Sequence, residues 1–394
     1  MVFSAFLRRK PLPILRKNAT IKKKSDYIVY IYEHKNWPQF TWDHERIADD
    51  LVEVRYQQGL LIGRMESIGF RIATETLLQT LTQDVVKSSE IEGEILDQEM
   101  VRSSVARRLG IENAALDPVD RNIEGVVEMV LDATQRFDEP LTKVRLLRWH
   151  ATLFPGGRAG FTKMRVGEWR TGHIEVVSGR MGRETVHFEG PQAQLVDHEM
   201  QLFLDWCNAA QSGDFVLKAA IAHLWFVTIH PFEDGNGRIG RAIADLMLAR
   251  SEKSSHRFYS LSAQIHKDRK NYYAILEQTQ KGDVDITAWL TWFLSCLKRA
   301  IESALDALNV IVQKAQFWEV FATISFNDRQ RKIINCLLDG FDGKLTSSKW
   351  AKITKCSQDT AYRDILDLID KGILVKNAEG GRSTSYFLVP WDKP

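Results

Sequence analysis

The residues with the clearest chemical potential lie in one twelve-residue segment, HPFEDGNGRIGR, which runs from His230 to Arg241. Gly235 and Gly237 permit a tight loop in which backbone N–H groups can converge on an anion. Apolar residues recur at helical spacing after the loop, so the loop opens a helix, and the N-terminus of a helix favours phosphate. The segment therefore predicts a phosphate-binding loop.

The charged side chains of this segment favour phosphate chemistry over a calcium loop. Arg238 and Arg241 are three residues apart on one helix face, where both can bind phosphate oxygens as bidentate donors. Asp234 offers a hard carboxylate oxygen suited to Mg²⁺, and His230 can accept a proton near neutral pH. An EF-hand is excluded, because counting from Asp234 the fifth position is Arg238 and the twelfth is not a glutamate. The segment predicts a phosphate-transfer site with a base beside it.

The elements that would position this segment are predicted to be mainly helices. Helical periodicity covers residues 42–81, 85–92, 99–150 and 192–309. Between the last two regions, residues 174–177 and 185–188 flank a glycine-containing turn and predict a β-hairpin. The tyrosine-rich stretch at 26–36 predicts a strand or extended segment.

Residues 326–394 are predicted to form a separate unit. Three short helices at 328–339, 347–354 and 358–371 are followed by two strands at 373–375 and 386–389, an order typical of a winged helix-turn-helix. The third helix, which would be the recognition helix, carries Asp359, Asp364, Asp367 and Asp370 against Arg363 and Lys371. Because DNA is a polyanion, these acids favour a protein-contact or dimerisation role over DNA binding.

Composition limits the class of protein. A chain of 394 residues with 44% hydrophobic and 26% charged residues is typical of a folded protein with two or three domains. The most apolar stretch, 215–229, is interrupted by Lys218 and His223, so we expect no membrane span. The four cysteines form no CxxC pair, which favours a reducing cytoplasm over a disulfide framework or a zinc site. Residues 1–25 carry eight basic residues and no acid, and we interpret them as a solvated tail.

The segment resembles the HxFx(D/E)GNGRxxR signature of Fic-domain proteins at every specified position. Members of that family typically transfer AMP from ATP to a hydroxyl of a target protein. The resemblance implies that His230 deprotonates the hydroxyl, Phe232 anchors the loop and Asp234 holds Mg²⁺. It implies that the nucleotide-binding residues are Gly235, Asn236, Gly237, Arg238, Gly240 and Arg241, with Tyr273 as an adenine-side contact. It also implies that the hairpin at 174–188 is a flap that aligns the target by strand addition.

A second pattern lies upstream. Residues 88–93, SSEIEG, fit the family's inhibitory pattern (S/T)xxxE(G/N), with Ser88 and Glu92 one helical turn apart and Gly93 after them. The resemblance implies that Glu92 pairs with Arg241 and occupies the place of the γ-phosphate.

Together these features predict a mainly α protein in five parts. They are a basic tail (1–25), a helical N-terminal domain with the inhibitory pattern (26–135), a Fic-type helical core with a β-hairpin flap (136–300), a connecting helix (301–325) and a winged helix-turn-helix (326–394). The predicted function is a cytoplasmic, self-inhibited protein adenylyltransferase with ATP, Mg²⁺ and a target hydroxyl as ligands. A nucleotide-sensing DNA-binding regulator, AMP removal at the same site and a homodimer remain open.

Overall fold

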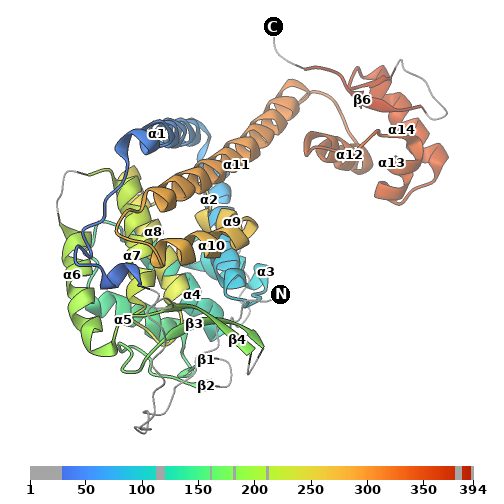
Figure 1. The fold of residues 1–394 in the computed structure, drawn as a ribbon. Helices are drawn as coiled ribbons and strands as arrows, with labels where there is room; N and C mark the ends of the chain where they lie inside the picture. Colours follow the sequence, from blue (N-terminus) through green and yellow to red (C-terminus); the bar gives the residue numbers. More distant parts are fainter. Residues whose placement is uncertain are drawn as a thin grey trace. The chain divides into compact units, whose positions relative to one another are not determined.

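The computed structural model describes residues 29–111, 120–159, 162–180, 183–209, 213–377 and 384–391. The protein is mainly α-helical, as predicted, and these residues contain three two-stranded antiparallel sheets (Figure 1). The basic tail (1–25) and the tip of the predicted hairpin (181–182) lie outside the described residues. The chain divides into two compact units, residues 1–302 and 303–394.

The first unit begins with one short 3₁₀ helix and three α-helices. They are η1 (Ile31–Glu33), α1 (His44–Ser67), α2 (Phe70–Ile91) and α3 (Gln98–Arg108). The predicted strand at 26–36 is wrong over its described residues, because the Glu33 carboxylate accepts the backbone N–H of Tyr30 at 2.8 Å and closes the η1 turn. Tyr30 and Tyr32 instead pack their rings against Phe188.

Helix α2 ends where the sequence predicts an end. Glu92 caps the helix, and Gly93 adopts φ +89°, a left-handed conformation that favours glycine. The chain then leaves the axis of α2. Glu92 and Glu94 therefore both lie at the C-terminal end of this helix, directly before and after Gly93.

The middle of the first unit is built mainly from helices. They are α4 (Arg121–Gln135), α5 (Lys143–Leu153), η2 (Ala193–Leu195), α6 (Val196–Asn208), α7 (Phe215–Ile229), α8 (Asn236–Glu252), α9 (Leu261–Lys267) and α10 (Arg269–Gln280). Nearly every residue of α7 is buried, as expected for a core helix that is apolar on all sides. No helix among the described residues is long and apolar enough to cross a membrane. Helices α7 and α8 pack closely against each other, and the loop from His230 to Gly235 connects them (Figure 1).

The predicted hairpin is present, with longer strands than expected. Strands β3 (Glu175–Arg180) and β4 (Arg183–Glu189) pair antiparallel, and the register shifts at Val176 and Val177. A smaller pair, β1 (Arg158–Ala159) and β2 (Thr162–Lys163), precedes it. Phe188 of β4 is 1% exposed and fixes the hairpin to the core of the unit.

The second unit has the predicted order of elements. The unit boundary falls within α11 (Thr287–Val320), which is followed by α12 (Asp328–Leu338), α13 (Ser347–Thr354), α14 (Gln358–Asp370), β5 (Leu374–Lys376) and β6 (Tyr386–Leu388). Phe317 and Trp350, both fully buried, lie in its apolar core. The identification of this unit as a winged helix-turn-helix stays a prediction.

One detail of the predicted recognition helix is wrong. Asp364 does not face outward, because it shares the buried face of α14 with Ala361, Ile365 and Leu368. Its carboxylate accepts two hydrogen bonds from the Arg329 guanidinium, at 2.7 and 3.0 Å. The outward acidity of α14 is therefore lower than the sequence implies.

Candidate active site

A pocket of about 270 Å³ lies where the α7–α8 loop, the β3–β4 hairpin and α10 meet. The pocket-lining side chains used below are His230, Asp234, Tyr273, Glu277, His187 and Glu92. They come from segments far apart in the sequence, and α7, α8 and α10 supply the rigid elements. The pocket is the candidate active site.

The α7–α8 loop is closed by its own side chains. The Asn236 amide donates to the Phe232 carbonyl at 2.9 Å, and its oxygen accepts the Phe232 N–H at 3.0 Å. Phe232 is fully buried and stacks on His150 with ring centroids 4.1 Å apart, which agrees with its predicted anchoring role. The Asn236 side chain therefore closes the loop, while its backbone N–H lies in the first turn of α8.

His230 is held in the tautomer that a general base needs. Its backbone is left-handed, with φ 52°, an uncommon conformation for a residue with a side chain. The ring Nδ1 lies 3.0 Å from the Val227 carbonyl, and since a carbonyl only accepts, Nδ1 carries the proton. Burial lowers the pKa of His230 to about 4, and the Arg170 charge acts in the same direction. Nε2 therefore carries a free lone pair at neutral pH.

Arg170 fixes the backbone of this loop, and sequence reasoning missed it. Its guanidinium donates to the carbonyls of His230 at 2.7 Å, Pro191 at 2.6 Å and Gly172 at 2.9 Å. Arg170 is 2% exposed, and burial lowers its pKa to about 10. No spacing in the sequence signals this role, because backbone carbonyls occur at every position and these lie up to 60 residues away.

The phosphate-binding end of the pocket is the start of α8. Gly235 caps this helix with φ +79°, and Asn236 and Gly237 begin it, so unpaired N–H groups are available there. Asp234 lines the pocket beside them, and burial raises the pKa of its carboxyl while the Arg238 charge opposes the shift. A carboxylate oxygen beside an anion site is a donor set that suits Mg²⁺ shared with phosphates. The residues present thus fit the predicted metal.

Arg241 is bound by both ends of the inhibitory pattern. Its Nε donates to Ser88 Oγ at 2.9 Å, and Nη2 donates to the Ser88 carbonyl and to Glu92 Oε1, both at 2.8 Å. The predicted pairing of Glu92 with Arg241 is therefore present. Arg241 is 2% exposed, and its Nη1 has no hydrogen-bond partner among the described residues.

The Glu92 carboxylate also lies on the first turn of α8. A Cβ built on Gly237 would come within 2.2 Å of Glu92 Oε1, so only glycine permits this approach. A carboxylate held at a helix N-terminus beside a buried guanidinium occupies a position that an anionic ligand would otherwise take.

Arg238 has a carboxylate partner that the sequence did not reveal. Its Nη1 donates to Glu94 Oε2 at 2.6 Å, and its guanidinium lies over the Phe154 ring at 5.0 Å. Arg238 is 3% exposed, whereas the Glu94 side chain is 48% exposed. Both arginines of the segment are thus paired with acids at the end of α2. Glu94 lies after the end of the helix, so helical periodicity in the sequence could not predict that it lies at the same site as Glu92.

Two other predicted contacts differ in outcome. Gly240 is not among the pocket-lining residues, and a Cβ there would lie 2.9 Å from Val227 Cγ1, so glycine permits the close packing of α8 on α7. Its role as a nucleotide-binding residue stays a prediction. Tyr273 does line the pocket, and its hydroxyl lies 3.4 Å from the Ile91 carbonyl at the end of α2. Its role as an adenine contact stays a prediction.

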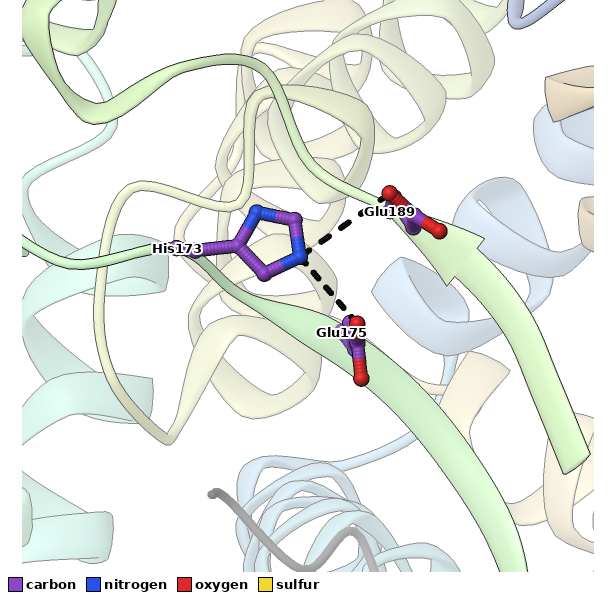
Figure 2. Close-up of side chains that lie close together, drawn as sticks. All are labelled: His173, Glu175 and Glu189. Atoms are coloured by element: carbon purple, nitrogen blue, oxygen red, sulfur yellow. Dashed lines mark hydrogen bonds and ion pairs between the residues drawn. The ribbon is translucent and has the colours of Figure 1, made fainter. Parts of the chain in front are cut away.

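A separate group of metal-ligand side chains lies at the base of the hairpin. Figure 2 shows the His173 ring directed at two carboxylates, with Nε2 3.2 Å from Glu175 Oε1 and 3.9 Å from Glu189 Oε2. These contacts connect the segment before β3 with both strands. The group does not include Asp234, so it is distinct from the predicted magnesium position.

Two protein-family models match parts of this chain. Residues 140–248 match the Fic/DOC family, and residues 30–111 match a domain of unknown function, DUF4172. The segment from His230 to Arg241 lies in the first match. Ser88, Glu92 and Glu94 lie in the second.

Curated proteins that are similar to this chain include protein adenylyltransferases of insects. Protein adenylyltransferase Fic of Drosophila grimshawi is 30% identical over 149 residues, which are 36% of this chain and 29% of that protein. Protein adenylyltransferase Fic of Culex quinquefasciatus is 24% identical over 235 residues, 58% of this chain and 42% of that protein. The chain thus spans less than half the length of these relatives.

Solved structures of Fic proteins superpose partially. A Fic family protein from Desulfovibrio desulfuricans G20 gives a TM-score of 0.49 at 19% identity, covering 88% of this chain and 97% of that one. Fic-1 from C. elegans gives 0.47 at 20% identity, covering 68% and 74%. The family match over 140–248 contains the complete signature from His230 to Arg241, and this part of the chain is a Fic domain.

Proposed function

We propose that this chain is a self-inhibited protein adenylyltransferase. It transfers AMP from MgATP to a Ser, Thr or Tyr hydroxyl of a target protein or of the chain itself. The observation that carries the proposal is one pocket in which a neutral histidine, a helix N-terminus and an acid lie together, while Glu92 holds the arginine that phosphates need.

His230 is the general base of the proposed reaction. Its Nε2 accepts the proton of the incoming hydroxyl as the hydroxyl oxygen forms a bond to the α-phosphorus. The bond between that phosphorus and the bridging oxygen breaks, and pyrophosphate leaves. The hydrogen bond from Nδ1 to the Val227 carbonyl stabilises the imidazolium that forms, and Arg170 keeps the loop in place.

Positive charge and N–H donors would hold the phosphates. The N–H groups of Asn236 and Gly237 and the guanidinium groups of Arg238 and Arg241 are the available donors. Asp234 would hold Mg²⁺, which supplies positive charge to the phosphates when bound. Positioning accounts for most of the rate in this type of transfer, so withdrawal of one donor has a large effect.

Self-inhibition follows from the pairing of the arginines. While Glu92 lies on the first turn of α8 and pairs with Arg241, a triphosphate cannot use that turn or that guanidinium. ATP then binds in a pose whose α-phosphorus is not aligned for attack. The pairing of Glu94 with Arg238 acts in the same direction, because it engages a second guanidinium that would otherwise bind phosphate.

The regulator hypothesis is less well supported. A protein that only senses a nucleotide has no use for a base such as His230. Helix α14 still presents Asp359 and Asp370 to solvent, which disfavours contact with DNA phosphates.

The base is tested in a variant freed from inhibition. Glu92→Gly should incorporate AMP from labelled ATP into protein, and Glu92→Gly with His230→Ala should lose about 10²–10⁴-fold of that rate while still binding ATP. Glu92→Gly with His198→Ala is the matched control, because His198 is an exposed histidine of α6. Transfer that persists without His230 would remove it from the mechanism.

A further inference from the structure

The β3–β4 hairpin needs external support. An isolated two-stranded sheet is marginally stable in water, and among the described residues β3 and β4 pair only with each other. Five residues of the hairpin nevertheless line the pocket: Glu175, Val176, Val177, His187 and Phe188. Contacts from other elements must therefore hold the hairpin at the pocket.

One face of the hairpin is held by aromatic packing. Phe188 is 1% exposed and meets the rings of Tyr30 and Tyr32 edge-on, with centroids 5.2 and 6.1 Å apart. These contacts fix β4 to the segment around η1.

The other face is held by a chain of polar side chains. His187 Nδ1 lies 2.7 Å from Glu277 Oε2 on α10, and His187 Nε2 lies 2.6 Å from Ser178 Oγ on β3. Since a carboxylate only accepts, Nδ1 donates to Glu277, and Nε2 shares a second hydrogen bond with the Ser178 hydroxyl. Lys281 binds the second oxygen of Glu277 at 2.5 Å and keeps that carboxylate in place. One imidazole thus connects both strands of the hairpin to a rigid helix of the pocket.

We propose that His187 is a positioning residue that fixes the hairpin against α10 and so sets where an acceptor polypeptide meets His230. The inference rests on the proposed function. Each strand has one edge without a strand partner among the described residues, and such an edge can pair with an extended chain. The hydroxyl of that chain reaches His230 in register only if the hairpin is fixed relative to α10, which lines the same pocket. Water needs no such alignment.

The proposal predicts how transferred AMP is partitioned. In the Glu92→Gly background, His187→Ala should lower the ratio of protein-bound AMP to free AMP about fivefold or more, with little change in ATP affinity. His187→Gln should recover part of the ratio, because its amide can donate to Glu277. His198→Ala is again the matched control and should leave the ratio unchanged. An equal fall of both products in His187→Ala would overturn the proposal.

Amide hydrogen exchange tests the same point without turnover. His187→Ala should raise the exchange rate of the hairpin amides in 175–180 and 183–189 about tenfold, because two side-chain hydrogen bonds are lost. His198→Ala should leave these rates unchanged. Unaltered hairpin protection in His187→Ala would refute the positioning role. If no variant transfers AMP, the proposed function fails, and the exchange rates still decide whether His187 holds the hairpin.

Discussion

Replacing Glu92 with glycine should destabilise the protein and at the same time increase its stabilisation by MgATP. The change leaves the Arg241 guanidinium, 2% exposed, with only the two hydrogen bonds that it donates to Ser88. Removing one partner of a fully buried ion pair costs about 3–5 kcal/mol. The Glu92 side chain is 25% exposed, so we expect roughly 2–3 kcal/mol here.

The expected melting shifts follow from this estimate. A loss of roughly 2–3 kcal/mol should lower the unfolding midpoint by about 4–12 °C, since a large domain loses about 2–4 °C per kcal/mol. MgATP at about 100 times its dissociation constant should return about 2.7 kcal/mol to the variant. The unmodified protein should gain clearly less, because its Arg241 is already paired.

Scanning calorimetry with and without MgATP measures both effects. Glu90→Gly is the matched control, because Glu90 lies on the same last turn of α2 but pairs with Lys87 at 2.7 Å and with His266 at 3.2 Å. Glu90→Gly measures how much stability is lost when a glycine is placed at the end of this helix. The reasoning is refuted if Glu92→Gly loses no more stability than Glu90→Gly, or if MgATP stabilises the unmodified protein as strongly as the variant.

Three further predictions concern other residues. Glu94→Ala should free Arg238 and, combined with Glu92→Gly, raise AMP transfer about twofold to tenfold above Glu92→Gly alone; equal rates would show that Glu94 does not restrain Arg238. Because the pKa of His230 is lowered to about 4 and its neutral form is the base, transfer by Glu92→Gly should vary less than about twofold between pH 7.5 and 5.5; a fall with a midpoint near 6.5 would contradict this. Burial and the nearby Asp245 raise the pKa of Asp84 to about 7, so folding loses stability as pH rises from about 4 to 7, and Asp84→Asn should raise the melting temperature more at pH 8 than at pH 5; an equal shift at both pH values would argue against it.

The local chemistry of the site could be predicted from the sequence, because it depends on residues that lie close together in the chain. The glycines and charged residues from His230 to Arg241 lie in one loop and the helical turn that follows it, so their spacing in the sequence determines their positions in space. Ser88 and Glu92 are likewise one helical turn apart, and both bind Arg241. Short-range sequence patterns also predicted the hairpin and the order of elements in the second unit.

Contacts that depend on tertiary packing could not be predicted from the sequence. Arg170 binds carbonyls, which no residue type marks, and Glu94 reaches Arg238 only because the chain turns at Gly93. The close packing of Gly240 against Val227 could not be predicted for the same reason, since it depends on how α7 and α8 cross. The tyrosine-rich stretch at 26–36 suggested a strand, and the packing of Tyr30 and Tyr32 against Phe188 instead follows from the position of the hairpin.

AMP incorporation in a set of three proteins tests the central claim most directly. The unmodified chain, Glu92→Gly, and Glu92→Gly with Arg241→Ala are incubated with labelled ATP and Mg²⁺, and label on protein is measured. The account predicts little label on the unmodified chain, strong label on Glu92→Gly, and loss of that gain when Arg241 is also removed, since the phosphate ligand is then missing. If Glu92→Gly carries no more label than the unmodified chain, Glu92 is not an inhibitor, and AMP removal becomes the better function for this site.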